Sequence, residues 1–215
     1  MSDAQRSRPA SAYQERADAL LALLRRDFGI PRTARTVIAV AGESGSGKSV
    51  TATDLASALN DAGIRTAIIH QDNYFVRPPR TNHEFRLTDL SSVGPQEVQM
   101  DLIQEQMRAF RAGEIVSAPI VDYAGNRFLS ELLDFSGADV LVVEGTYALR
   151  LDGVDIAVFL EATWKDTEGR RKARNRDIDD PFVDQVLDIE HRLIAPQRMR
   201  ADILLDRDYN IALAR

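Results

Sequence analysis

The sequence predicts an α/β fold in which helices cover both faces of a parallel β-sheet. Short apolar runs rich in β-branched residues alternate along the chain with longer segments of helical periodicity. A loop of glycine and serine joins the first apolar run to a helical segment within residues 37–50, "VIAVAGESGSGKSV". Because parallel strands need crossover connections, which are usually helices, this alternation favours a parallel sheet.

The composition is typical of a globular protein with a full hydrophobic core. Of the 215 residues, 44% are hydrophobic and 28% are charged, and the formal net charge is −6. This length predicts one domain, residues 13–215, after a polar N-terminal segment of residues 1–12 that we expect to be poorly ordered. The acidic balance disfavours nucleic acid and anionic membranes as partners, but it allows a local basic pocket for a small anion.

Cysteine is absent from the sequence, which excludes disulfides, thiolate metal sites and cysteine nucleophiles. No apolar run approaches the ~20 residues that a membrane-spanning helix needs. The first residues lack the apolar segment of a signal peptide. We therefore expect a cytoplasmic protein that acts on a small molecule, without a nucleic-acid or membrane partner. The sequence leaves open whether the chain forms a homo-oligomer.

The first half of the chain predicts two helices and two strands around the glycine-rich loop, followed by a third helix. The first helix is expected at residues 13–28, before Gly29 and Pro31, and either packing or a dimer contact accounts for it. The elements that follow are a buried strand at 35–41, a helix at 49–63, a strand at 65–70, a long loop with a proline pair at 71–94 and a helix at 95–113.

The second half predicts a hairpin and three further strands. Weak alternation over residues 114–137, with a turn at 124–126, indicates the hairpin. Thr163 and Asp166 have the spacing of a capping box. The remaining elements are buried strands at 138–145 and 154–162, a basic helix at 163–177, a helical stretch at 180–200 and a last strand at 201–206.

The glycine-rich loop matches the pattern G-x-x-x-x-G-K-[ST] of a phosphate-binding P-loop. Glycine lets the backbone surround a phosphate with N–H groups, and the following helix adds the positive end of its dipole. Lys48 would reach the β- and γ-phosphates, and the Ser49 hydroxyl would bind Mg²⁺. The expected nucleotide-binding residues are Gly42, Glu43, Ser44, Gly45, Ser46, Gly47, Lys48, Ser49 and Val50.

The context of this motif separates it from a chance match. A flexible connection with a solvated lysine is the alternative, but the buried strand before the loop and the helix after it favour the P-loop. The base-reading motif N-K-x-D of GTPases and the L-S-G-G-Q signature of transporter ATPases are both absent from the sequence. A kinase instead needs a group that aligns or deprotonates the acceptor hydroxyl, a second acid near the metal, and cations over the transferred phosphate.

Two carboxylates follow predicted strands and suit the first two of these roles. Asp72 lies just past the second strand and Glu144 ends the apolar run "VLVVE". The carboxyl ends of parallel strands line the ligand crevice, so both side chains are expected near the phosphates. Glu144 would hold Mg²⁺ through water. The alternatives are an Asx turn for Asp72 and a solvated strand end for Glu144.

A basic stretch at residues 170–176, "RRKARNR", suits the third role. Its guanidinium groups would close over the γ-phosphate as part of a lid at about 163–182. A solvated helix face is the alternative for such a run of charges. The three histidines of the chain lack the spacing of metal ligands, and we expect His70 and His191 to be structural.

The order of these motifs resembles the uridine kinase and phosphoribulokinase-like group of P-loop kinases. The resemblance covers roughly residues 35–206 and is carried by the P-loop, "HQDNYF", "VVEG", "RRKARNRD" and "ADILLD". It implies a P-loop NTPase-type sheet of five parallel strands with flanking helices, a small β-hairpin and a helical lid. It also implies ATP and Mg²⁺ as cofactors, and it makes Asp72 the general base.

The same resemblance implies roles for further residues. Lys48 and the lid arginines Arg171, Arg174 and Arg176 would join Asp72 in catalysis. The hairpin would help to bind the acceptor. The expected acceptor-binding residues are Asp72, Tyr74, Arg80, His83, Asp122, Tyr123 and Asn126.

The acceptor-reading motifs of uridine kinases are not retained here. Val121 and Asn126 stand where those enzymes have the tyrosine and histidine that contact the pyrimidine. The aspartate that holds the ribose hydroxyls is replaced by Val93. Because a site built for a polar ligand discriminates strongly, these losses predict another substrate. The segment 77–86 offers Arg77, Arg80, Asn82, His83 and Arg86 for an anionic or sugar-like acceptor, unless it is an exposed loop without a ligand.

The residues therefore favour an ATP-dependent kinase that phosphorylates a hydroxyl of a small metabolite, with a nucleoside or sugar-like acceptor. A nucleotide-dependent switch or assembly ATPase with a protein partner is the alternative, because the acceptor contacts of the family are missing. A catalytically impaired relative is disfavoured by the presence of Lys48, Ser49, Asp72 and Glu144.

Overall fold

A six-stranded sheet forms the centre of the molecule. The computed structural model describes residues 12–169 and 181–214. The strand order is β2-β5-β1-β6-β7-β8. The first five strands run parallel, which confirms the predicted sheet, and β8 pairs antiparallel with β7 at one edge. The strands are β1 Thr36–Gly42, β2 Thr66–His70, β5 Val140–Glu144, β6 Ile156–Leu160, β7 Ile203–Leu205 and β8 Ile211–Leu213.

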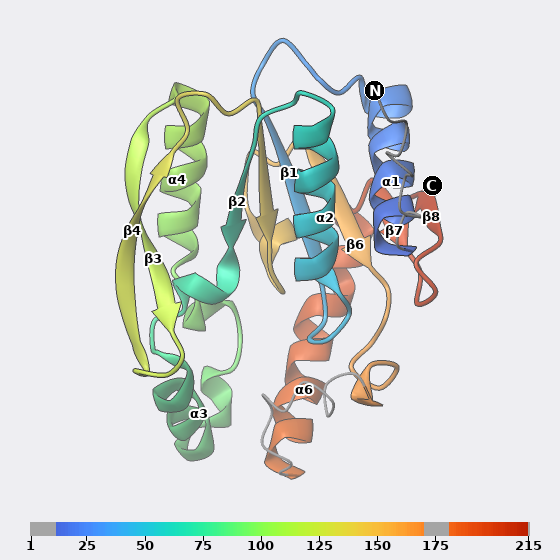
Figure 1. The fold of residues 1–215 in the computed structure, drawn as a ribbon. Coiled ribbons are helices and arrows are strands. Elements are labelled where there is room, and N and C mark those ends of the chain that lie inside the picture. The colour runs from blue at the N-terminus through green and yellow to red at the C-terminus, as the bar shows by residue number, and fades with distance from the viewer. Residues whose placement is uncertain (1–11, 170–180, 215) are drawn as a thin grey trace, which may run out of the picture.

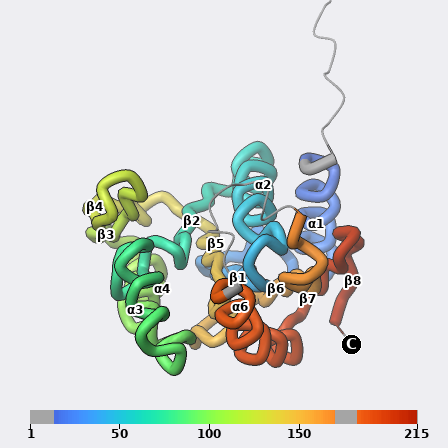
Figure 2. Tube along the Cα trace, turned by 90° about the horizontal axis from the view of Figure 1, so that it is seen from below, coloured from blue at the N-terminus to red at the C-terminus, as the bar shows by residue number. Residues whose placement is uncertain are grey.

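Helices cover both faces of this sheet (Figures 1 and 2). The helices α1, Ala12–Phe28, and α2, Lys48–Asp61, lie on one face, and α4, Met100–Ala112, and α6, Pro181–Ile194, lie on the other. Alternate residues of β1 point to opposite faces, so Ile38 packs in the cluster with α1 and α2 while Ala39 packs with α4 and α6. The wholly buried β1, β5 and β6 account for the unbroken apolar runs in the sequence.

A separate hairpin lies beside α4 (Figure 1). Its strands are β3, Ile115–Asp122, and β4, Arg127–Asp134, and they pair antiparallel through their full length. The turn at residues 123–126 includes Asn126, whose φ is +48°. Asparagine tolerates this left-handed conformation better than most residues do. The predicted hairpin and the place of its turn are confirmed.

The segment at 71–94 is not the long loop that the sequence predicted. It contains a 3₁₀ turn at Gln71–Tyr74, the helix α3 at Pro79–Thr88, and a second 3₁₀ turn at Leu90–Ser92. Pro79 occupies the first turn of α3, a position where proline favours a helix. Because only Asn82 of α3 is buried, the helix leaves little apolar periodicity in the sequence.

Two helix boundaries also differ from the prediction. Helix α4 begins at Met100 because Pro95–Glu97 forms a 3₁₀ turn, and α6 ends at Ile194 before another 3₁₀ turn at Ala195–Arg200. The capping box opening the predicted basic helix is present, since Thr163 donates its N–H and its hydroxyl to Asp166 at 2.9 and 2.7 Å. Residues 164–167 then form a turn and residues 168–169 are helical, and residues 170–177 of the predicted helix lie outside the described residues. Among the described helices, none is long and apolar enough to cross a membrane.

Candidate active site

The P-loop connects β1 to α2 at the carboxyl edge of the sheet. Gly47 is the N-cap of α2 with a φ of +100°, and a Cβ there would come within 2.5 Å of the Tyr209 hydroxyl. No side chain in the described part of the chain caps this helix start. The N–H groups of the first turn are therefore available to an anion, in the arrangement that favours phosphate. Lys48 and Ser49, expected at the phosphates and Mg²⁺, open the helix.

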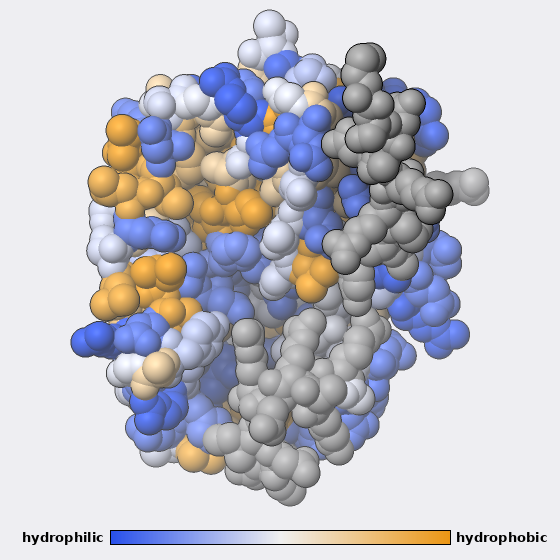
Figure 3. All heavy atoms as spheres, in the orientation of Figure 1, coloured by the Kyte–Doolittle hydropathy of each residue, from blue (hydrophilic) through white to orange (hydrophobic). Residues whose placement is uncertain are grey.

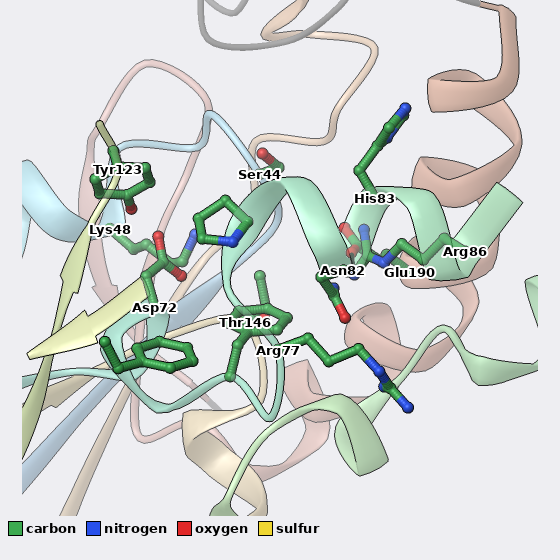
Figure 4. Close-up of a pocket in the computed structure, with 13 residues that line it drawn as sticks. Ser44, Lys48, Asp72, Arg77, Asn82, His83, Arg86, Tyr123, Thr146 and Glu190 are labelled. Atoms are coloured by element: carbon green, nitrogen blue, oxygen red, sulfur yellow. Dashed lines mark hydrogen bonds and ion pairs between the residues drawn. The ribbon is translucent and has the colours of Figure 1, made fainter. Parts of the chain in front are cut away.

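A cavity of about 240 Å³ opens beside the P-loop (Figure 4). It is built from the carboxyl ends of β2 and β5, from α3 and α6, and from the tip of the hairpin. Its lining residues are Ser44, Lys48, Asp72, Phe75, Arg77, Pro79, Asn82, His83, Arg86, Tyr123, Phe128, Thr146 and Glu190. The topology thus brings six separate segments of the chain to one site, next to the expected phosphate position.

Asp72 lies in the 3₁₀ turn that follows β2 and lines this cavity together with Lys48. Figure 4 places the Asp72 carboxylate and the Lys48 side chain on the same side of the cavity, next to Tyr123. A carboxylate beside the P-loop lysine is positioned to face both the terminal phosphate and an incoming hydroxyl group.

Glu144 is buried at the end of β5, directly opposite His70 at the end of β2. Its Oε1 lies 2.8 Å from Nδ1 of His70, and this hydrogen bond, with the nearby charges of Glu144 and Asp72, raises the pKa of His70 despite its partial burial. Its Oε2 is buried without a hydrogen-bond partner among the described residues. An unpartnered carboxylate oxygen at this edge is suited to a metal-bound water.

The donor set fits a magnesium ion shared with a nucleotide. Within the described residues no cluster of three or more acidic or histidine side chains can hold a metal alone. Mg²⁺ commonly keeps several waters and binds through one or two protein groups plus substrate phosphates. The Ser49 hydroxyl and Glu144 Oε2 would supply those protein contacts.

Glu43 has a second role that the sequence did not indicate. This buried P-loop residue accepts a hydrogen bond from the Trp164 N–H at 2.7 Å, and its other oxygen lies 2.6 Å from Nδ1 of His191. Thr167 donates its hydroxyl to the Ser44 carbonyl at 3.2 Å. These contacts fasten the P-loop to the segment after β6 and to α6. The only sequence signal was a glutamate at a variable motif position.

A buried ionic network forms the far side of the cavity. Arg86 of α3 donates to both oxygens of Glu97 at 2.6 and 2.8 Å and to Glu190 of α6 at 3.0 Å. Burial alone would lower the pKa of Arg86, but its bonds to Glu97 and the charge of Glu190 outweigh burial and raise it. Burial raises the pKa of Glu190 against the attraction of Arg86. Glu190 carried no motif and was missed from the sequence.

The hairpin tip is fastened to α3 by its polar residues. Asn126 accepts a hydrogen bond from the Arg80 N–H at 2.8 Å and donates to the Thr81 hydroxyl at 3.1 Å. Asp122 accepts from the Gly125 N–H and from Arg127, and the hydrogen bond from Gly125 is the larger cause of its lowered pKa. These side chains hold the tip in place.

The predicted acceptor residues therefore fall into three groups. Asp72, His83 and Tyr123 line the cavity. Arg80 and Asn126 connect the hairpin tip and α3 without lining the cavity, and Asp122 bonds within the hairpin. Tyr74 is buried in the core, where its hydroxyl donates to Gln106. The predicted lid arginines Arg171, Arg174 and Arg176 lie outside the described residues.

Comparison with known proteins identifies relatives whose names include kinases. A curated bifunctional alpha-galactosidase/sucrose kinase of Mediterraneibacter gnavus is 31% identical over 192 residues, which are 82% of this chain. The match spans 20% of that longer protein. A uridine kinase of Staphylococcus haemolyticus is 27% identical over 183 residues, covering 79% of this chain and 86% of that enzyme.

A solved structure described as a possible uridine kinase from Bacillus stearothermophilus has the same fold. It superposes with a TM-score of 0.64 at 21% identity and covers 89% of this chain and 97% of that one. The model of the phosphoribulokinase / uridine kinase family matches residues 37–210, from the first residues of β1 to the turn before β8. The chain therefore belongs to the phosphoribulokinase / uridine kinase family.

Proposed function

We propose that this family member is a Mg²⁺·ATP-dependent kinase that phosphorylates a hydroxyl group of a carbohydrate-like acceptor. The observation that carries the proposal is the cavity in which Asp72 and the P-loop Lys48 face one space, closed on its far side by polar groups of α3 and α6. Such a cavity has room for a small hydroxylated molecule between the phosphate position and α6.

Each group in the site has a separate task in phosphoryl transfer. The N–H groups around residues 43–49 would bind the phosphates, and Lys48 would offset the charge on the transferred group. Asp72 would orient the acceptor hydroxyl and take its proton as the new O–P bond forms and the bond to the ADP oxygen breaks. Bound Mg²⁺ would neutralise phosphate charge, held through Ser49 and Glu144.

The acceptor end of the cavity favours a sugar over a nucleoside. Asn126, at the position where uridine kinases have a base-contacting histidine, has its side chain occupied by Arg80 and Thr81. At the matching tyrosine position, Val121 offers no polar side chain, and its N–H donates to Asn73. The similarity to a protein whose name includes sucrose kinase also supports a sugar acceptor.

A coupled assay for ADP release tests the proposal. We expect one or a few sugars from a panel of sugars, polyols and nucleosides to stimulate ADP release by the wild-type protein. Asp72→Asn should retain nucleotide binding by calorimetry but lose about 10²- to 10⁴-fold in acceptor-dependent rate. Wild-type turnover by this variant would overturn the assignment of the base. Stimulation by a protein partner and by no hydroxyl compound would favour a switch ATPase instead.

A further inference from the structure

Glu190 has hydrogen-bonding capacity that the rest of the described chain does not use. Its side chain is 13% exposed and lines the cavity from α6. One carboxylate oxygen accepts a hydrogen bond from Arg86 at 3.0 Å. Among the described residues, this is the single hydrogen bond of the Glu190 side chain. A carboxylate has about four acceptor positions, so most of the acceptor capacity of Glu190 is left for a ligand. Because Glu190 lines the cavity, its side chain borders the space where an acceptor would bind.

Glu97 shows what a saturated carboxylate looks like in the same network. It accepts two hydrogen bonds from Arg86, one from the Asn82 side chain at 2.9 Å and one from the Gly94 N–H at 2.9 Å. Its side chain is 1% exposed and does not line the cavity. Glu97 therefore holds α3 and the following turn together, whereas Glu190 is the partner that Arg86 presents to the cavity (Figure 4).

Each arginine of segment 77–86 contacts another group of the protein, and Arg77 and Arg86 also line the cavity. The Nε and Nη2 groups of Arg86 donate to Glu97 and Glu190. Arg80 donates to the Ala124 carbonyl at 3.2 Å. The Arg77 guanidinium lies 3.6 Å above the Phe85 ring, and in Figure 4 it extends away from Asp72 and Lys48.

The group of Arg86, Glu97 and Glu190 carries one net negative charge, whereas the cavity lining as a whole also includes the cations Lys48 and Arg77. One guanidinium, that of Arg86, is shared by two carboxylates, and Asp72 adds a third carboxylate across the cavity. Lys48 lies beside Asp72 in Figure 4, and its charge would be paired with the phosphates of a bound nucleotide. A phosphate or carboxylate group of an acceptor that lay against Glu190 would meet like charge, which disfavours that placement.

We propose that Glu190 is a specificity-determining residue that accepts hydrogen bonds from hydroxyl groups of an uncharged sugar or polyol, and that it excludes anionic acceptors. The inference rests on the proposed kinase function and narrows its substrate class. Two neighbouring hydroxyl groups of a sugar can each donate a hydrogen bond to one carboxylate. Hydrogen bonds to a charged acceptor are among the stronger ones.

The first test needs only the wild-type protein. Acceptor-dependent ADP release is measured with sucrose, D-fructose and ribitol as neutral probes, and with D-glycerate and D-ribose 5-phosphate as anionic probes. The best neutral probe should exceed both anionic probes in kcat/KM by at least about tenfold. An anionic probe that equals or exceeds the neutral ones would overturn the inference while leaving the kinase function intact. If no hydroxyl compound is phosphorylated, the proposed function fails as well.

The second test changes the carboxylate itself. Glu190→Gln keeps the shape of the side chain, and we expect it to raise KM for the best neutral probe by about tenfold to a hundredfold, with kcat and the KM for ATP within about threefold of wild type. The same variant should reduce the ratio of kcat/KM for the best neutral probe to kcat/KM for D-glycerate. Asp188→Asn is the matched control, because this α6 carboxylate is 45% exposed and pairs with Arg192 on the same helix. An unchanged KM in Glu190→Gln would overturn the inference.

Discussion

At the scale of single residues, the charged side chains near the cavity are of two kinds: some stabilise the fold, and others are available to a ligand. Glu97 is saturated by three partners and is fully enclosed, so removing it would take the acceptor from the Asn82 side chain and the Gly94 N–H and leave Arg86 with Glu190 alone. Glu190 is buried beside the same arginine with one hydrogen bond. A largely buried carboxylate with so few partners does not gain stability from its charge, and its place in the cavity wall is consistent with binding.

The raised pKa of Glu190 makes this argument testable through stability. Burial disfavours its charged form, so folding stabilises the protonated form and that contribution is lost as the pH rises through the folded-state pKa. We therefore predict that Glu190→Gln gains stability relative to wild type as the pH rises from about 4 to neutrality. Urea unfolding at a series of pH values measures this difference. A difference that is constant over that range would contradict the prediction.

Glu43 has the opposite character, because both of its oxygens are used. Replacing it by alanine leaves the Trp164 N–H and the His191 ring nitrogen without their partner. We predict that Glu43→Ala lowers the free energy of unfolding by about 1–3 kcal/mol, which chemical denaturation would measure. Glu105→Ala on the exposed face of α4 is the control and should change it by less than about 0.5 kcal/mol. Equal effects of the two substitutions would argue against the fastening role of Glu43.

At the scale of elements, α2 is bounded by glycines of two kinds. Gly47 precedes it with a φ of +100° and Gly63 follows it with a φ of +81°. A Cβ on Gly63 would meet no atom within 4 Å, whereas a Cβ on Gly47 would collide with Tyr209. Gly47 is thus needed both for its positive φ and because Tyr209 lies too close for a side chain. Gly63 is needed for its positive φ alone.

This difference predicts separable effects. Gly63→Ala should lower the free energy of unfolding by about 1–2 kcal/mol through strain and leave nucleotide binding unchanged. Gly47→Ala must also displace Tyr209 or the P-loop, so we expect it to weaken binding of a non-hydrolysable ATP analogue by at least about tenfold, measured by calorimetry. Nucleotide affinity that is the same in both variants would show that the approach of Tyr209 does not matter.

The elements also show how far the sequence could lead. The parallel strands, α1, α2 and the hairpin were predictable because each has a strong apolar pattern or a clear turn signal. Helix α3 was missed because it begins at the second residue of a proline pair and buries one residue. Tyr74 was expected at the acceptor, but the 3₁₀ turn after β2 directs it into the core. Glu190 could not be found from a motif, because only the packing of α6 against α3 places it near Asp72.

At the scale of the whole molecule, the P-loop is the point where distant parts of the chain meet. The Tyr209 hydroxyl donates to the Ser46 carbonyl at 3.0 Å from the turn before β8, and Arg16 of α1 lies 4.2 Å above the Tyr209 ring. Glu43 reaches α6 on the other side of the loop. A ligand that orders this loop therefore acts on contacts with both ends of the described chain and with both faces of the sheet.

We accordingly predict that nucleotide binding stabilises the whole fold cooperatively. A non-hydrolysable ATP analogue with Mg²⁺ at one hundred times its Kd should add about 2.7 kcal/mol, which for a chain of this size is a rise of roughly 5–10 °C in Tm. Removing Mg²⁺ with EDTA should reduce the rise, because phosphate charge is then less well neutralised. Lys48→Ala should abolish it, whereas Lys165→Ala, at an exposed lysine, should retain it. A single calorimetric transition that shifts only in the wild type and the control supports a P-loop coupled to the entire core, and an unshifted transition in wild type would remove the basis for nucleotide binding here.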